Sequence, residues 1–520
     1  MKKILIYGLC FLASVFFLTD CESFEFTNTN PNVSTKVTPG MLATKLITDI
    51  TRNGSSSSHG IGSDYVNWLR DNMISKEIYW LEVAERSWMY NSFGRISFDP
   101  LTTLNNISSM TGFAGDNEAV VNSYRALGHF VRVYIFYHLT MKVGDIPYSE
   151  AMQGDDGIYY PKYDSQKDVF IGLLNELDEA DRLFASGASF DGDILYGGDP
   201  ARWRKAVNVL QLRLLISLSD KENDSGLNVK GRFQTTVNSR PLFTSNADNC
   251  QLVYEDRAGM KFPFYRENNN SEQFVQTSSV VIDMLKILKD RRLFYFANPT
   301  PQSVSAGTPS SDWEAYNGVE PSNTFNDVQA VVTAGQASRL NLRYFELPDC
   351  EPHAILSYTE QQFMLAEAAA RGWIGGDAKA YYEEGIRAAM SFTAGNTPDN
   401  PDYHHNMMIT DSYVEDYLQE DGVKFPANVD EQIHHIMIQK YLANFLQSPW
   451  TSFYECRRTG IPALPVNPLS NLNVPGDRMP VRWMYPQVEY DINSENVEAA
   501  VAAQFNGTDD NNGVIWILQK

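Results

Sequence analysis

Two groups of aromatic side chains lie among aspartate and asparagine residues, a pattern suited to binding a sugar or a peptide. The first group is Trp68, Tyr79, Trp80, Trp88 and Tyr90, accompanied by Asp64, Asn67, Asp71 and Asn91. The second is Trp313 and Tyr316, accompanied by Asp312 and Asn317. Flat aromatic faces stack on the apolar C–H faces of sugar rings and also accept peptide side chains. Neighbouring carboxylates and amides bond hydroxyl or amide groups.

We therefore predict that a ligand contacts both groups, with core packing as the alternative for each ring. The predicted contact residues are Trp68, Tyr79, Trp80, Trp88, Asn91, Trp313, Tyr316 and Asn317. Trp313 is flanked by Ser, Asp, Glu and Gly in a polar loop, which makes it the least core-like of the tryptophans.

The remaining reactive side chains do not form a catalytic pattern. Glu360 and Glu367 are two helical turns apart, about 10 Å, and no third catalytic element accompanies them, so we expect solvated or salt-bridged carboxylates. His404 and His405, like the pair His434 and His435, are adjacent, and adjacent helical residues diverge by about 100°. There is no HExxH, GxSxG or P-loop arrangement. We predict that the protein is not an enzyme.

Three further motifs have a structural and a functional interpretation. Asp191, Asp193 and Asp199 surround glycines but do not match the EF-hand spacing. We therefore predict no cofactor and leave a structural calcium ion open. Arg457 and Arg458 could hold an anion by bidentate bonds, although internal ion pairs are favoured among so many carboxylates. The turn from Gly144 to Tyr148 is interpreted as structural.

The N-terminus has the layout of a bacterial lipoprotein signal. Lys2 and Lys3 precede an apolar run from Ile4 to Leu18, too short for an ordinary membrane span, and Cys21 follows. We predict a signal peptide at 1–20, lipidation at Cys21, and a flexible tether over 21–39 that is rich in Thr, Asn, Pro and Ser. Attachment to the membrane would be by the lipid alone. Cys250, Cys350 and Cys456 imply no zinc site, and a disulfide between two of them is left open.

The composition and net charge of the chain limit the classes of ligand that the protein could bind. The formal net charge of −22 repels nucleic acid and anionic headgroups and suits a neutral or cationic ligand. A hydrophobic content of 43% is ample for a large core. No linker-like break follows the tether, so we predict a single domain over 40–520.

The sequence pattern predicts a mostly α-helical fold. Helical periodicity is predicted at 119–142, 167–186, 201–218, 358–372, 377–393 and 430–447. Thr359 is a candidate N-cap and Gly372 a C-cap signal. Two pairs of predicted helices have the small residues that tight helix pairing needs and resemble tetratricopeptide units. They are 167–186 with 201–218, and 358–372 with 377–393. Between them, residues 219–357 form a large loop-rich insertion with a few short strands, and binding sites tend to lie on such loops.

Several motifs, in order along the chain, resemble those of the SusD/RagB family of nutrient-binding outer-membrane lipoproteins of the Bacteroidetes, in its SusD-like branch. They include residues 144–151 (GDIPYSEA), 196–199 (YGGD) with Trp203, and 212–214 (LRL). Tyr358, Glu360, residues 365–368 (LAEA) and Gly372 match the family's hallmark helix. Residues 290–293 (DRRL) depart slightly from its usual DPRL, and 457–460 (RRTG) and 480–482 (PVR) close the pattern. Trp203 and Trp483 lie inside these scaffold motifs, so we expect structural roles for both.

The resemblance implies a mostly α fold with four tetratricopeptide-like helix pairs supporting a loop-rich half. It also implies a lipoprotein on the outer face of the outer membrane that binds an oligomeric nutrient. As a lid subunit it would deliver this ligand to a TonB-dependent, SusC-like transporter. An oligosaccharide is the favoured ligand and an oligopeptide the alternative, while a lipid-anchored glycosidase or an adhesin is less favoured.

Overall fold

The computed structural model describes residues 36–51, 68–69, 71–81, 94–267 and 271–520. Within these ranges the fold is helical with few short strands, as predicted. No helix among the described residues has the length and apolar character needed to cross a membrane. The predicted signal peptide, Cys21 and most of the tether lie outside the described residues.

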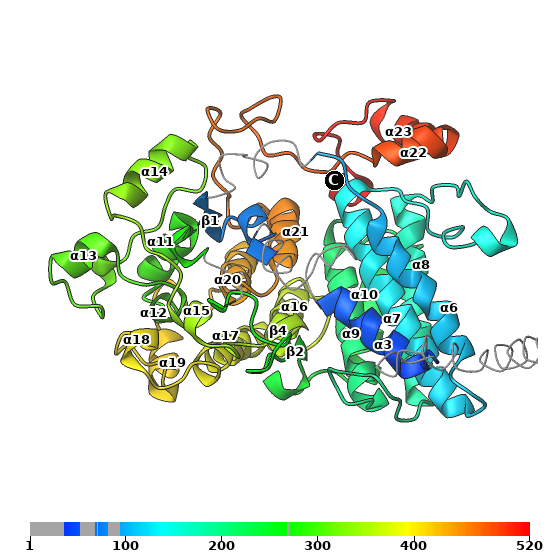
Figure 1. The fold of residues 1–520 in the computed structure, drawn as a ribbon, viewed down its shortest axis with the longest axis horizontal. Coiled ribbons are helices and arrows are strands. Elements are labelled where there is room, and N and C mark those ends of the chain that lie inside the picture. The colour runs from blue at the N-terminus through cyan, green and yellow to red at the C-terminus, as the bar shows by residue number, and fades with distance from the viewer. Residues whose placement is uncertain (1–35, 52–67, 70, 82–93, 268–270) are drawn as a thin grey trace, which may run out of the picture.

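One half of the molecule is a layered array of antiparallel helices (Figure 1). Its members are α3 (Pro39–Thr51), α6 (Asn105–Gly112), α7 (Glu118–Val143), α8 (Gln166–Ala185), α9 (Pro200–Ser217) and α10 (Val229–Ser239). Successive helices α7, α8, α9 and α10 pack side by side. Asp199 caps α9 by accepting the Ala201 N–H at 2.8 Å, and Pro200 occupies the first turn. The predicted helices at 119–142, 167–186 and 201–218 are thus confirmed within about two residues.

A central group of helices joins this half to the rest. It consists of α16 (Tyr358–Ala370), α17 (Ala378–Gly395), α20 (Val429–Ala443) and α21 (Pro449–Thr459). Helices α16 and α17 form the predicted hairpin, and Gly372 takes the left-handed φ of +71° that ends α16. The predicted cap Thr359 is wrong, because Ser357 Oγ accepts the Glu360 N–H at 3.0 Å. Helix α20 stops at Ala443 instead of reaching position 447, because Asn444 caps it and Leu446 turns the chain with a φ of +55°.

The other half is rich in loops and short helices (Figure 1). The helices are α11 (Ser279–Leu288), α12 (Leu293–Phe296), α13 (Pro301–Ser305), α14 (Phe325–Thr333), α15 (Arg343–Glu346), α18 (Pro401–His404) and α19 (Asp411–Tyr417). The described strands are β1 (Ile78–Trp80), β2 (Cys250–Leu252), β3 (Val275–Thr277) and β4 (His353–Leu356). Strand β1 pairs antiparallel with β3, and β2 with β4. Helices α22 (Gln487–Ile492) and α23 (Ser494–Phe505) follow near the C-terminus.

Apolar side chains form three buried clusters. The largest fills the helical half, the second fills the loop-rich half around β1, β3, α11 and α12, and the third joins α16, α17, α19 and α20. Cys250, Cys350 and Cys456 are buried as free thiols, so the structure contains none of the disulfides that these three residues could form.

Candidate functional site

The predicted contact residues nearest β1 are part of the core of the loop-rich half. Trp68, Tyr79 and Trp80 are 2%, 2% and 4% exposed. The Trp68 indole packs on Phe262 and Phe264, with ring centroids 5.5 Å and 5.1 Å apart. All three side chains belong to the buried apolar cluster of the loop-rich half, so the structure shows the core-packing alternative for all three.

The second predicted group is divided between core and surface. Tyr316 is 1% exposed and donates its hydroxyl to the Ser310 carbonyl at 2.7 Å, so it too is a core residue. Trp313 is half-buried and meets Phe294 edge to face at 4.7 Å. Asn317 is exposed, and its amide donates to the Gln336 carbonyl at 2.7 Å. Trp313 and Asn317 therefore stay accessible to a ligand.

The fold brings the two groups together in part. Strand β1 pairs with β3, and the Val319 N–H donates to the Thr277 carbonyl at 3.0 Å, which places the segment after Asn317 beside the small sheet. Trp313 lies at the opposite end of α11, where Lys286 Nζ is 2.9 Å from Glu314 Oε2. A ten-residue helix is about 15 Å long. Trp313 is therefore not part of one continuous aromatic surface with β1.

Two of the predicted contacts, Trp88 and Asn91, lie outside the described residues. So do Tyr90, Asp64 and Asn67 of the same group.

Sequence reasoning missed two half-buried tyrosines, Tyr254 and Tyr265, on the loop that Trp68 supports. The Lys261 ammonium lies 4.7 Å from the centre of the Tyr265 ring and 2.6 Å from Glu267 Oε2. An alternation in the sequence could have revealed this loop, because Phe262 and Phe264 are buried while Tyr265 points outward.

The carboxylates that looked like a catalytic pair belong to a buried ionic network. Arg458 Nη1 and Nη2 lie 2.6 Å and 2.8 Å from the two oxygens of Glu367, and Arg458 also contacts Glu455. Arg213 Nε lies 2.8 Å from Glu360. Burial alone would raise the pKa of Glu455, but Arg458 and Lys440 lower it to about 2. Glu367 and Glu455 therefore stay ionised, and the ion pairs of this network join helices.

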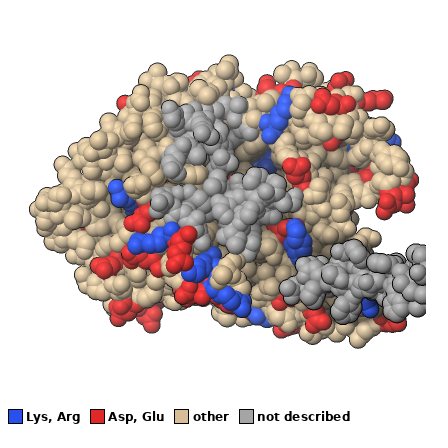
Figure 2. Space-filling model, in the orientation of Figure 1, with Lys and Arg blue, Asp and Glu red and all other residues tan. Residues whose placement is uncertain are grey.

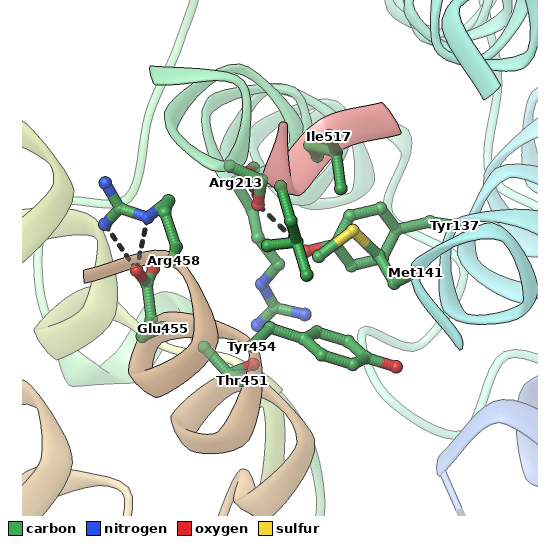
Figure 3. Close-up of a pocket in the computed structure, with 10 residues that line it drawn as sticks. Tyr137, Met141, Arg213, Thr451, Tyr454, Glu455, Arg458 and Ile517 are labelled. Atoms are coloured by element: carbon green, nitrogen blue, oxygen red, sulfur yellow. Dashed lines mark hydrogen bonds and ion pairs between the residues drawn. The ribbon is translucent and has the colours of Figure 1, made fainter. Parts of the chain in front are cut away.

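A small cavity lies beside this network, where α7, α9, α21 and the C-terminal turn η7 (Trp516–Leu518) meet (Figure 3). Tyr137 and Met141 line it from α7, Arg213 from α9 and Tyr454 from α21. Its volume of about 10 Å³ has room for a single water molecule. It is a packing void at the junction of the helices and is too small for an oligomer.

The histidine and aspartate motifs are also structural. His404 Nε2 lies 3.1 Å from Asp399, whereas His405 packs near Asn341. Asp193 accepts the N–H groups of Leu195, Tyr196 and Gly198 and the indole N–H of Trp203. Its oxygens are thus occupied by donors. Across the described part of the chain, no group of three or more His, Cys, Asp or Glu side chains is placed to hold a metal ion.

The turn after α7 has the expected structural role. Gly144 takes a φ of +95°, and Asp145 Oδ1 accepts the Gln166 N–H at 2.7 Å, which holds the start of α8. Trp203 is buried in the helical core, and Trp483 is nearly buried beside Trp450 and Phe453. Arg458 is ion-paired as predicted. Arg457 differs, because it donates to the carbonyls of Val481 and Met141 instead of a carboxylate.

Figure 2 shows the distribution of charged side chains on one face of the molecule. Acidic side chains lie along the outer rim of this face, and acidic and basic side chains lie side by side below the residues drawn in grey.

Comparison with known proteins places the fold in one family. The SusD-like_2 family model, described as "Starch-binding associating with outer membrane", matches residues 31–486. A SusD homolog from Bacteroides fragilis NCTC 9343 is 41% identical, with a TM-score of 0.87 over 93% of this chain and 100% of its own. A protein from Bacteroides vulgatus ATCC 8482, described as "a putative outer membrane protein, probably involved in nutrient binding", is 35% identical, with a TM-score of 0.80 over the same shares.

A third relative matches locally. SusD-like protein P2 of Formosa agariphila is 27% identical over 106 residues, which is 20% of this chain and 21% of that protein. The family model covers most of the chain, and the solved SusD homolog from Bacteroides fragilis aligns with 93% of it. The chain belongs to the SusD-like family of outer-membrane-associated, nutrient-binding proteins.

Proposed function

We propose that this protein captures an oligosaccharide at the outer face of the outer membrane and delivers it, as a lid subunit, to a TonB-dependent SusC-like transporter. Lipid attached to Cys21 would be its membrane anchor. The observation that carries the proposal is the family match over residues 31–486, since that family is described as starch-binding and associated with the outer membrane.

The chemistry of the described residues supports binding without catalysis. Glycoside hydrolysis needs one carboxyl group with a raised pKa beside a second carboxylate in a cleft. The neighbouring carboxylates Glu367 and Glu455 are instead kept ionised by Arg458. Trp313 and Asn317, together with Tyr254 and Tyr265, supply accessible aromatic and amide groups on the loop-rich half.

The test is calorimetric titration of the detergent-purified lipoprotein with panels of neutral glycans, acidic glycans and peptides. Binding of a glycan, without release of shorter products, is the expected result. Binding of peptides with no glycan bound would establish the oligopeptide alternative, which the net charge favours for cationic sequences. Cleavage of a glycan by the purified protein would show a glycosidase.

The transporter is tested separately by affinity purification from membranes. Co-purification of a large outer-membrane barrel is expected. Isolation with a different protein and no barrel would show an adhesin or scaffold instead.

A further inference from the structure

The chain between α21 and α22 contains a loop, residues 467–478, that lies at the top of the view in Figure 1. Three aliphatic side chains of this loop are exposed: Leu469 by 84%, Leu472 by 62% and Val474 by 83%. Single exposed aliphatic residues are common on protein surfaces. Three of them within six residues are an apolar segment whose contact with water is unfavourable.

The polar residues between these aliphatic side chains lie inside the loop. Asn471 and Asn473 are 6% and 5% exposed. The Asn471 amide donates to the carbonyls of Gly476 and Arg478, both at 2.8 Å, and the Asn473 amide donates to Asn512 Oδ1 at 2.8 Å. The loop therefore has the inverse of the usual arrangement, because its asparagines are buried and bonded while its aliphatic side chains are exposed.

The loop is attached to the rest of the molecule at several points. Asn512 Nδ2 donates to the Val474 carbonyl at 3.0 Å, and Ser470 Oγ donates to the Ser322 carbonyl. On the C-terminal side, Met479 packs against the apolar clusters of both halves. These contacts hold the aliphatic side chains in position before any partner binds, and such preorganisation reduces the entropic cost of association.

The loop is also uncharged. No charged residue occurs over residues 461–476, although 20% of the chain is charged and its net charge is −22. The next two residues are the exposed Asp477 and Arg478, whose opposite charges are 3.6 Å apart. The loop is thus an uncharged, apolar element on an acidic protein. Its electrostatic complement is a neutral, apolar surface of another protein.

Other classes of occupant match the loop less well. Sugar rings stack on aromatic faces and bond to free polar side chains, whereas the exposed side chains here are aliphatic and the asparagines are already bonded. Segments that insert into a membrane surface use aromatic and basic residues, and residues 467–476 contain neither. A second copy would bring together two proteins that each carry a charge of −22.

The length of the tether limits which proteins the loop can reach. About 15 residues separate Cys21, the proposed anchor, from Lys36, where the described residues begin. A chain of that length spans at most about 50 Å. The body of the protein would therefore stay close to the membrane, where a protein partner embedded in that membrane is concentrated beside it.

We propose that the loop docks on an apolar surface at the outer face of the SusC-like transporter. Leu469, Leu472 and Val474 enter the contact, and Asn471 and Asn473 hold them in position. This inference rests on the proposed function and names the surface through which the lid subunit binds its partner.

The experiment is affinity purification of the full-length lipoprotein from membranes, with the amount of co-purified barrel as the readout. Leu469→Asp and Val474→Asp place a charge in the apolar contact. We expect each substitution to reduce the co-purified barrel about fivefold, and the double variant to reduce it more than about twentyfold. Leu469→Met keeps an apolar side chain and should retain the barrel.

The matched control is Ile287→Asp, at an aliphatic side chain of α11 that is 77% exposed. It should leave the amount of barrel unchanged. Because the substituted side chains are exposed, all variants should unfold at the wild-type temperature. Glycan affinity, measured by calorimetry on the purified variants, should also be unchanged.

The outcomes separate this inference from the proposed function. A double variant that retains the barrel would overturn docking through the loop and leave the proposed function intact. Loss of glycan affinity in Leu469→Asp would show that the loop contacts the ligand instead. If no barrel co-purifies with the wild type, both the docking and the transporter partnership fail.

Two further measurements test the other occupants on the soluble Cys21→Ala protein. Binding to vesicles of phosphatidylethanolamine and phosphatidylglycerol that Leu469→Asp abolishes would assign the loop to a lipid surface. A dimer in analytical ultracentrifugation that Leu469→Asp dissociates would assign it to a second copy. Either result would overturn the inference, and we expect a monomer that does not bind the vesicles.

Discussion

Arg458 of α21 and Glu367 of α16 form a buried bidentate ion pair, with Nη1–Oε1 and Nη2–Oε2 distances of 2.6 Å and 2.8 Å. The pair joins two helices that are 91 residues apart in sequence. If one member of the pair is removed, the other charge stays buried with less opposite charge beside it. The resulting decrease in the free energy of unfolding is usually larger than the net stabilisation that the intact pair provides.

Glu367→Ala should therefore reduce the free energy of unfolding by about 3 kcal/mol, measured by urea denaturation. The matched control is Glu314→Ala, which breaks the ion pair to Lys286 at a side chain that is 79% exposed. That change should cost less than about 1 kcal/mol. Equal effects of the two substitutions would contradict a structural role for the Arg458–Glu367 pair.

Because the pKa of Glu77 is raised in the folded protein, the free energy of unfolding should fall as pH rises. Burial raises its pKa from 4.5 to about 8, although the Leu446 N–H donates to Oε2 at 2.9 Å. The folded state thus keeps a proton that the unfolded chain loses above pH 4.5, so this contribution is full below that pH and is lost as pH rises towards 8.

Glu77→Gln removes the titration and keeps an oxygen for Leu446. When the pH is raised from 5 to 7, the free energy of unfolding of the wild type should fall by about 2 kcal/mol more than that of the variant. Chemical denaturation of both proteins at the two pH values measures this. Identical pH profiles for the two proteins would contradict the raised pKa.

Two glycines of the loop before α9 should differ sharply in how much an alanine substitution reduces stability. Gly192 and Gly197 both have left-handed backbone, with φ of +85° and +65°. A Cβ at Gly192 would lie 1.9 Å from the Gly40 carbonyl oxygen, whereas one at Gly197 would meet nothing within 4 Å. Gly197→Ala should cost about 1 kcal/mol, from backbone strain alone.

Gly192→Ala should cost more than about 3 kcal/mol, because the start of α3 must also move away. Thermal unfolding of the two variants, compared with wild type, checks the difference. Similar melting temperatures would show that α3 is not packed against this loop.

Alanine substitutions at Trp68 and Trp313 should have different effects: the first should mainly reduce stability and the second should mainly weaken ligand binding. Trp68→Ala removes a core side chain that is 2% exposed and should cost about 4 kcal/mol. Trp313→Ala, at a half-buried position, should cost about 1 kcal/mol and weaken glycan binding roughly fivefold. Denaturation and calorimetry on each variant test this. Unchanged glycan affinity in Trp313→Ala would remove Trp313 from the binding site.

Cys21→Ala should release the protein from membranes and leave its ligand affinity unchanged, because we propose that the lipid on Cys21 is the anchor. Fractionation of cells, followed by titration of the soluble protein, measures both. Cells that lack the partner barrel are the necessary control. A variant that still sediments with membranes in those cells would refute the proposed anchor.

Local patterns predicted much of the helical scaffold. Residues 119–142 have near-helical apolar spacing, and the observed α7 differs by one residue at each end. The GGDP motif predicted the start of α9, because Asp accepts first-turn N–H groups and Pro fits the first turn. Helix ends were less predictable where two capping residues competed, as with Ser357 and Thr359 in α16.

The roles of individual aromatic and charged residues could not be read in the same way. Trp68 and Trp313 both lie among polar neighbours in sequence, yet Trp68 is covered by Phe262 and Phe264, nearly 200 residues away. Arg457 and Arg458 are adjacent, yet Arg458 points to Glu367 and Arg457 to backbone carbonyls, since neighbouring side chains on a helix diverge.

The sequence by itself determined the helical scaffold and the family, because periodicity, caps and motifs depend on neighbours within a few turns of the chain. The tertiary structure decided which aromatic rings are core and which carboxylate each buried arginine pairs with. Burial and charge compensation depend on contacts between distant segments, which no local pattern encodes.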